Sequence, residues 1–297
     1  MTDRRAPAPL AIALLFSFLC LVWSSTWLAI RYGLRDLPPY TSAALRFAIA
    51  GGLMAALAGP LRRLEGGTPP PLGLWSALGI LNFAVSYGLV YYCEQAGLLP
   101  SIACVLWAVF PLMMALSGRL FLGERLRPGQ VFGFVSSFGG VVYLFRTDLS
   151  SMGSETIPLA LLLLGSPLVC AVGTTLLKKY GAGSSSVLVN RNAMLTGALL
   201  LGAFALWREH DAEFHWTGRA VLCLCYLSLF GTFLSFGIYH WLLRWTSASK
   251  MSLIAVITPA LALLLDWAVG LLQPTWSLLS GTALILAGTM LVVRRVR

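Results

Sequence analysis

Ten long apolar runs constrain the fold of this chain more than any other feature of its sequence. Each run approaches or exceeds the roughly 18–20 residues that a helix uses to cross a hydrocarbon core about 30 Å thick. In lipid, the backbone groups of such a run must pair within the run, so each run is expected to be a helix. The predicted spans are residues 10–30, 40–61, 72–93, 98–122, 128–145, 157–177, 186–206, 220–243, 251–272 and 276–293.

The composition supports a membrane protein. The chain is 58% hydrophobic and only 11% charged, with a mean hydropathy of +0.81. Typical soluble proteins are about a quarter charged. The first run follows a basic N-terminus but continues too long for a signal peptide, so we expect it to be retained as a span. The sequence therefore predicts an all-α polytopic membrane protein.

The distribution of basic residues predicts the orientation. If the N-terminus is inside, most of the 21 Lys and Arg residues fall in cytoplasmic loops, and Arg46 lies within a span. Such an excess follows the positive-inside rule. Both termini are therefore expected to be cytoplasmic. The net charge of +10 is explained in this way without a nucleic-acid partner.

A second constraint is an internal repeat with an offset of 148 residues. Residues 101–144 recur as residues 249–292, and the offset carries Pro111 to Pro259 without a gap. Two glycines seven apart recur in the same way, Gly133 and Gly140 in one copy, and Gly281 and Gly288 in the other. We therefore divide the chain into a first five-helix repeat (1–146), a connecting loop (147–156) and a second five-helix repeat (157–297).

The odd number of spans in each repeat has a consequence for topology. The second repeat must enter the membrane from the opposite side, so the two repeats are expected to be inverted. Many secondary transporters use inverted repeats to build one site that opens alternately to either side. The repeat thus favours a transporter over a scaffold or an enzyme.

Ionisable residues inside spans are the first candidates for function, because an unpaired charge in the bilayer is costly. Arg46, Glu94 and Asp266 are all predicted in the same half of the membrane, with Arg46 about 9 Å deep. We hypothesise that Arg46 pairs with Glu94 or Asp266. These residues could have a purely structural role, either as an ion pair or, for Arg46, as an arginine that snorkels toward water. The other possibility is a role in substrate or proton handling.

Polar and aromatic side chains at comparable depths are candidates for lining a cavity. They could also be interfacial anchors, or hydroxyls bonded to their own helix. Pro111 and Pro259 are predicted to kink their helices. The kinks could frame a cavity, or they could be ordinary kinks that only affect helix packing. The repeated glycines predict close helix packing. The substrate-binding candidates are Trp23, Ser24, Ser25, Thr26, Tyr87, Tyr91, Trp107, Thr174, Thr175, Tyr239 and His240.

Metal and cofactor sites are not expected. The six cysteines form no CxxC pair, and histidine is sparse. The acidic, His-containing loop 207–218 is interpreted as a solvated connector. The chain has no P-loop for direct ATP drive.

Several motifs resemble one family. The stretch Trp23–Arg31, reading WSSTWLAIR, resembles the W-G-S-x-F/W-x-A-I-R/K of the EamA-type branch of the drug/metabolite transporter superfamily. Arg46-Phe47 is similar to its R-F pair, and Tyr92–Gln95 to an E-Q variant. Pro111 followed by Leu122–Leu126, reading LGERL, resembles its P-L…L-G-E-x-L.

This resemblance implies a bacterial ten-helix carrier that most often exports amino acids or related metabolites. Its central cavity would be lined by the first, third, fourth, sixth, eighth and ninth helices. Two departures stand out. Ser24 replaces a glycine, and the Gly123-Glu124 pair maps to Leu271-Leu272 in the second copy. We therefore interpret Glu124 as a structural cap or ion pair.

The resulting expectation is a multi-pass inner-membrane secondary transporter that exports small, zwitterionic metabolites by alternating access. Its drive would be a proton gradient acting through Glu94 or Asp266, or facilitated diffusion. A non-transporting scaffold or sensor, and a membrane-embedded enzyme, are the alternatives. The expected partners are a small solute and the lipid bilayer, and Gly129-x-x-x-Gly133 is a weak indication of a homodimer.

Overall fold

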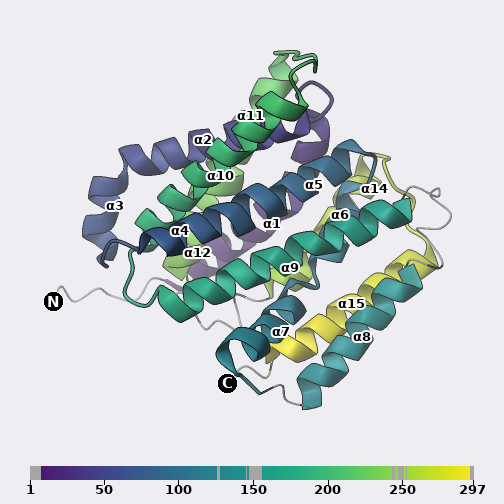
Figure 1. Cartoon of the computed structure of the whole chain (residues 1–297). Helices are drawn as coiled ribbons and strands as arrows, with labels where there is room; N and C mark the ends of the chain where they lie inside the picture. The colour runs from purple at the N-terminus through teal and green to yellow at the C-terminus, as the bar shows by residue number, and fades with distance from the viewer. Residues whose placement is uncertain are drawn as a thin grey trace.

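The computed structural model describes residues 8–125, 128–144, 146, 156–242, 245–246, 251 and 253–294. Within these residues the chain is helical, apart from an isolated bridge between Thr68 and Ser184 (Figure 1). The helices are α1 (Pro9–Gly33), α2 (Pro39–Ala56), α3 (Ala58–Glu65), α4 (Leu72–Leu78), η1 (Gly79–Val85), α5 (Ser86–Gln95), α6 (Pro100–Trp107), α7 (Phe110–Leu122), α8 (Pro128–Leu144), α9 (Thr156–Tyr180), α10 (Ser186–Arg208), α11 (Gly218–Ser228), η4 (Leu229–Leu234), α12 (Ser235–Leu242), α14 (Ile254–Ala268) and α15 (Trp276–Arg294).

The helical membrane class is confirmed. Within the described residues, six segments are long and apolar enough to cross a bilayer, and Ile254–Ala268 and Trp276–Leu291 are shorter apolar helices. The number of ten spans stays a prediction. The six segments are Pro9–Gly33, Leu72–Gln95, Pro100–Leu122, Thr156–Tyr180, Ser186–Arg208 and Gly218–Tyr239.

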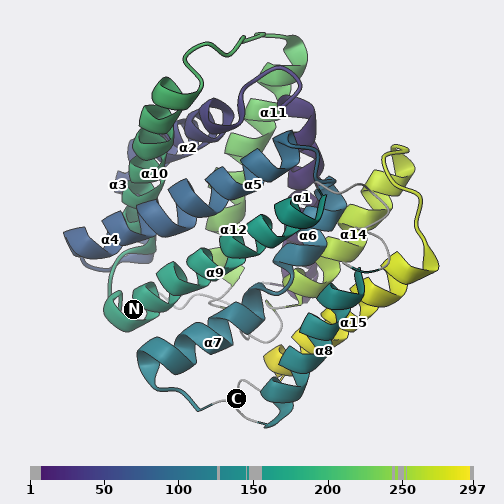
Figure 2. The ribbon, with the colours of Figure 1, turned by 45° about the vertical axis from the view of Figure 1, so that its right-hand side comes forward.

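Helices α8 and α15 lie side by side along one flank of the bundle (Figure 2). The repeated glycines make this approach possible, as the sequence predicted. A Cβ on Gly140 would lie 2.8 Å from Ile285 Cγ1, and one on Gly288 would lie 2.6 Å from the Gly133 carbonyl oxygen. Between them, Ser137 Oγ donates to the Ile285 carbonyl oxygen at 2.9 Å. The two helices therefore cross in opposite chain directions with almost no space between their backbones.

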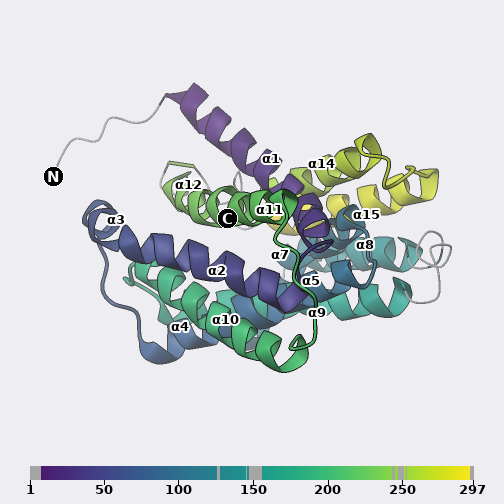
Figure 3. The ribbon, with the colours of Figure 1, turned by 90° about the horizontal axis from the view of Figure 1, so that it is seen from above.

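Helices α2 and α10 form the opposite flank (Figure 3). Glu209, directly after α10, is 8% exposed. Its carboxylate accepts from the backbone N–H groups of Tyr40 and Thr41, both at 2.8 Å, and from Thr41 Oγ1 at 2.7 Å. These donors belong to the first turn of α2, whose N–H groups have no partner within the helix. The end of α10 thus caps the start of α2.

The reciprocal cap lies at the other end of this pair. Glu65 ends α3, which continues the direction of α2 after Leu57. Its carboxylate accepts from the backbone N–H of Ser186 at 3.0 Å and of Val187 at 3.1 Å, in the first turn of α10. Burial alone raises the pKa of the Glu65 carboxyl, but these and further serine hydrogen bonds outweigh it and leave the pKa below its usual value. Two carboxylates therefore hold α2 and α10 together from both ends.

The loop between α1 and α2 is fixed to the start of α11. Asp36 accepts from Arg219 through two bonds, Nη2 to Oδ1 at 2.6 Å and Nε to Oδ2 at 2.8 Å, and from Thr217 Oγ1 at 2.7 Å. Hydrogen bonds from Arg219, then from Thr217, lower the pKa of Asp36 to about 2. Bidentate geometry of this kind is the strong form of an arginine–carboxylate pair.

The two prolines of the repeat behave differently. Pro111 lies at the start of α7, and α6 ends at Trp107. In a continuous helix the ring of Pro111 would clash with the carbonyl group of Trp107, four residues earlier. Figure 2 shows α7 leaving in a different direction from α6. Thr289 Oγ1 of α15 donates to the Ala108 carbonyl at this break, at 3.1 Å. Pro259, by contrast, lies inside the unbroken α14.

Candidate functional site

Arg46 of α2 is the largest buried polar side chain in the described part of the chain, at 2% exposure. Its Nε donates to Thr232 Oγ1 at 2.9 Å and its Nη1 to the Tyr91 hydroxyl at 3.4 Å. The guanidinium carbon also lies 5.0 Å from the centre of the Tyr87 ring, a cation–π contact. Residues from α2, α5 and η4 therefore meet around one buried cation, which we call the arginine centre (Arg46, Tyr87, Tyr91 and Thr232).

Local structure in η4 allows this contact. In a π-helical turn the backbone bonds run to the fifth residue, and such turns are frequent at functional sites. Thr232 Oγ1 follows the same spacing and donates to the Leu227 carbonyl at 2.8 Å. A Cβ on the neighbouring Gly231 would lie 2.7 Å from Thr26 Cγ2 and 3.5 Å from Arg46 Nη2. Glycine thus brings η4 close to both α1 and the guanidinium.

The direct ion pair expected for Arg46 is not formed. Neither carboxylate lies within 4.0 Å of the guanidinium among the described residues, because Arg46 is turned toward Thr232 and Tyr91. Asp266, 1% exposed, instead accepts from the backbone N–H of Ser101 at 2.8 Å, in the first turn of α6. Arg46 and Glu94 remain within electrostatic reach of each other.

Glu94, at the end of α5, is fully buried. Both of its carboxyl oxygens are without a hydrogen-bond partner within the described residues. Its backbone carbonyl accepts from Arg31 Nη1 at 2.5 Å, so that arginine contacts the main chain of Glu94. An unpartnered buried carboxyl is costly and calls for a functional explanation.

A second polar group lies where α5, α6 and α9 meet. Trp107 Nε1 donates to Ser166 Oγ at 2.9 Å, and Ser86 Oγ lies 2.9 Å from the same oxygen. Further along η1 and α9, Asn82 Nδ2 donates to Thr174 Oγ1 at 3.1 Å. Trp107 and Thr174 thus each take part in a side-chain hydrogen bond that joins the first half of the chain to α9.

The hydroxyls of the first span mostly bond to their own helix, as the structural alternative predicted. Ser24 bonds to the Cys20 carbonyl, and Thr26 to that of Trp23 at 2.8 Å. Ser25 alone among these three reaches another described helix, with its Oγ 2.6 Å from the Tyr226 hydroxyl of α11. These contacts favour a packing role for Ser24 and Thr26.

The remaining candidates lie apart from the arginine centre. The rings of Trp23 and Tyr239 are 5.6 Å apart, in a cluster between α1 and α12. Thr175 is buried and its hydroxyl faces Met114 Sδ at 4.0 Å. The side chain of His240 lies outside the described residues. Glu124 forms the ion pair that was expected of it, with Lys178 Nζ 2.6 Å from its Oε1.

Sequence reasoning missed Thr232, Asn82, Ser86 and Ser166. A lone asparagine in an apolar run was a usable signal, because a buried amide demands partners. The serines and Thr232 gave little signal, since isolated hydroxyls are common in membrane helices and usually bond to their own backbone.

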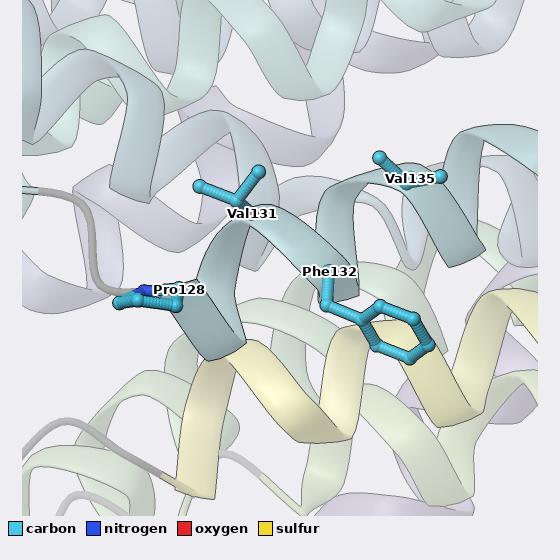
Figure 4. A pocket seen from close by; sticks show the side chains of 4 residues that line it. All are labelled: Pro128, Val131, Phe132 and Val135. Carbon is cyan, nitrogen blue, oxygen red and sulfur yellow. The ribbon is translucent and has the colours of Figure 1, made fainter.

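Two surface depressions lie away from the arginine centre. One, of about 540 Å³, follows α8 and is lined by Pro128, Val131, Phe132 and Val135 (Figure 4). These four side chains come from one exposed apolar face, as expected of a helix surface turned to lipid. The other, of about 300 Å³, lies between α1 and α11 and is lined by Ser25, Leu28, Ala29, Tyr32, Leu222, Cys223 and Tyr226.

Comparison with protein families identifies the architecture. The model of the EamA-like transporter family matches the chain twice, over residues 10–146 and residues 157–294. The chain belongs to the EamA-like transporter family. This EamA-like protein is therefore a multi-pass membrane transporter, and the family resemblance of its motifs is confirmed.

Two of three similar proteins, YvbV and YedA, are named as transporters without a stated substrate. The chain is 30% identical to the uncharacterized transporter YvbV of Bacillus subtilis, with 94% of this chain and 90% of YvbV covered. It is 24% identical to the protein PagO of Salmonella typhimurium, covering 96% and 94% of the two chains. It is also 28% identical to the uncharacterized inner membrane transporter YedA of Escherichia coli, covering 85% and 80%.

A solved crystal structure shares the fold of this EamA-like transporter. The two superpose with a TM-score of 0.67, and the match covers 98% of this chain and 100% of the other at 22% identity. The arrangement of helices around the arginine centre therefore belongs to a fold that is known by experiment.

Proposed function

We propose that this EamA-like transporter exports small zwitterionic metabolites, amino acids among them, across the inner membrane by alternating access of two inverted five-helix halves. The observation that carries the proposal is the arginine centre. Arg46 and Tyr91 come from the first half and Thr232 from the second, so a solute held there would touch both halves at once. YedA is named an inner membrane transporter, which supports the same location here.

The chemistry of the arginine centre suits a carboxylate. A guanidinium has five N–H donors in a planar fork that matches a carboxylate, and the bonds to Thr232 and Tyr91 use two of them. The Tyr87 and Tyr91 rings provide an apolar wall beside it. A zwitterion brings no net charge into such a site, and its carboxylate is the end that Arg46 can pair.

The pattern of helix contacts supports an inverted repeat. The closely packed pairs include α8 with α15, α2 with α10, α1 with α14, and α9 with α6 and α7. If each predicted span is exchanged for its counterpart in the other half, this set of pairs is unchanged. Ser137 and Ile285, which meet at the centre of the α8–α15 crossing, are themselves 148 residues apart, the offset of the sequence repeat. Opposite chain directions at this crossing agree with opposite membrane topology.

Burial of the arginine centre supports an occluded state between the two open ones. Arg46 is 2% exposed and Tyr91 is fully buried. Alternating access requires such a state, in which the solute site is closed to both sides. The break at Pro111 and the π-helical segments η1 and η4 are the positions at which we propose that the halves bend.

Substrate counterflow in proteoliposomes tests this proposal. Purified protein is reconstituted with a saturating unlabelled solute inside, and entry of the same labelled compound is followed for a panel of neutral amino acids, sugars and drugs. Truncating one partner of a buried charged contact costs about 2–5 kcal/mol. Arg46→Ala should therefore lower the initial rate at limiting solute by about 30-fold or more. Arg46→Lys should fall between, since lysine keeps the charge but loses the planar fork.

The matched control is Arg119→Ala, which removes an exposed arginine at the end of α7. It should transport like the wild type. Absence of counterflow with every amino acid, sugar and drug of the panel would contradict the carrier function and would favour a scaffold or sensor. Equal rates for Arg46→Ala and the control would contradict the role of the arginine centre.

A further inference from the structure

Glu94 is a buried ionisable residue whose surroundings are not explained by solute binding at the arginine centre. Its side chain is fully buried, and both carboxyl oxygens are without a hydrogen-bond partner among the described residues. Packing does not require a carboxyl there, and an ionised one would have lost its hydration without gaining a hydrogen bond in return. A carboxyl that carries a proton avoids most of that cost.

The neighbouring acid is held in a different way. Asp266 accepts a hydrogen bond of 2.8 Å from the Ser101 N–H, in the first turn of α6. N–H groups at the start of a helix stabilise negative charge. Glu94 and Asp266 interact electrostatically, and two buried carboxyls that repel each other favour carrying one proton over two negative charges. The hydrogen bonding therefore assigns the anion to Asp266 and the proton to Glu94.

Charged and titratable groups on α1, α2, α6 and α14, and on α5 itself, contribute to the electrostatic surroundings of Glu94. Two cations face it, from α1 and α2, and one anion faces it from α14. The uncharged titratable neighbours are a phenol and a thiol on α5 itself and a thiol on α6. These groups are Arg31, Arg46, Asp266, Tyr91, Cys93 and Cys104. With the nearby Asp266 charged, one cation is balanced, and the other can balance Glu94 when it ionises.

We propose that Glu94 carries the coupling proton of this transporter. A hydronium ion on one side of the membrane gives its proton to a Glu94 carboxylate oxygen and leaves water. The neutral carboxyl is buried in the occluded state and returns the proton to water on the other side. This inference rests on the proposed function and adds its driving force. It places the proton on Glu94 and leaves Asp266 as a fixed anion.

The test uses full-length protein in proteoliposomes, with two assays on each variant. Counterflow at equal pH on both sides measures solute exchange and needs no proton movement. Accumulation driven by an imposed pH gradient measures coupling, and a gradient of about one unit can concentrate a solute about tenfold at one proton per solute. The variants are Glu94→Gln, which is isosteric and permanently neutral, and Asp266→Asn.

For the wild type we expect both counterflow and gradient-driven accumulation. Glu94→Gln should keep counterflow and lose the tenfold accumulation, whereas Asp266→Asn should keep pH-dependent accumulation at a lower rate. Gradient-driven accumulation by Glu94→Gln at the wild-type level would overturn the assignment, as would loss of its counterflow in well-folded protein. Wild-type counterflow without any proton effect would overturn coupling and leave the proposed function intact. Absence of counterflow in the wild type would remove both.

Infrared difference spectroscopy reports the proton directly and does not depend on transport. The band of a protonated carboxyl should appear in the wild type at neutral pH, persist in Asp266→Asn and disappear in Glu94→Gln. If Glu94→Gln does not fold, Asp266→Asn still decides. Disappearance of the band in that variant would place the proton on Asp266 and contradict the proposal.

Discussion

The reciprocal caps of α2 and α10 give the sharpest prediction about stability. Glu209→Ala removes three hydrogen bonds, of 2.8, 2.8 and 2.7 Å, from the first turn of α2. Loss of a side-chain cap costs about 0.5–2 kcal/mol. Loss of the negative charge beside a helix N-terminus adds about 0.3–1 kcal/mol. We therefore expect Glu209→Ala to destabilise the protein by about 1–3 kcal/mol.

The assay is thermal unfolding of the detergent-solubilised protein, followed by the loss of a monodisperse peak or by intrinsic fluorescence. In a protein of this size each kcal/mol corresponds to a shift in apparent Tm of about 2–4 °C. Glu209→Ala should thus melt several degrees below the wild type. Glu65→Ala should have an effect of similar size, because its carboxylate accepts an equivalent set of bonds at the start of α10.

The matched control is Glu213→Ala, in the same loop. Glu213 is 85% exposed and contacts only the exposed His215, at 3.3 Å, among the residues that the structure describes. Surface substitutions of this kind change stability by about 0.5 kcal/mol or less. The two caps are about 35 Å apart along α10, so the double variant should show the sum of the single effects. If Glu209→Ala has the same apparent Tm as Glu213→Ala, the proposed stabilisation by the reciprocal caps is wrong.

Three further outcomes follow from the same structure. Asp36→Asn should lower the apparent Tm above about pH 4. Because the pKa of Asp36 in the folded protein is lowered to about 2, the difference in Tm from the wild type should shrink as the pH falls from about 4 toward 2. Melting curves in a series of buffers would show this. Gly288→Leu should disrupt the α8–α15 crossing and cost about 1–3 kcal/mol, whereas the same change at Gly139, where a Cβ meets open space, should melt near the wild type. Trp107→Phe should slow counterflow by about fivefold, through loss of about 1 kcal/mol of hydrogen bonding to Ser166; an unchanged rate would show that this bond does not contribute to transport.

The helical fold was largely predictable because each apolar run has only one way to satisfy its backbone in lipid. The close packing of α8 and α15 at the repeated glycines was also predictable, because small residues seven apart share one helix face. The asymmetry between the two prolines was not. Pro111 interrupts its helix and Pro259 does not, although the sequence around both is repeated. A break depends on whether a neighbouring helix supplies a hydrogen bond to the freed carbonyl. At Pro111, Thr289 supplies this bond to the Ala108 carbonyl.

The candidate site was predictable in its residue types and not in its pairing. Burial of a charge inside a span identified Arg46, Glu94 and Asp266 correctly as unusual. Their partners depend on side-chain direction, which a period of 3.6 residues does not fix across helices. The neutral partners Thr232 and Tyr91 took the place of the expected acid, and the π-helical turn that positions Thr232 has no recognisable sequence signal.

The central claim is that Thr232 and Arg46 line one site that opens alternately to the two sides of the membrane. A single cysteine at position 232, in a background with the six native cysteines replaced, can be labelled with a membrane-impermeant maleimide added from inside or outside. We predict labelling from both sides and protection from both by a transported amino acid. Labelling from one side only, or no protection by solute, would contradict alternating access at the arginine centre.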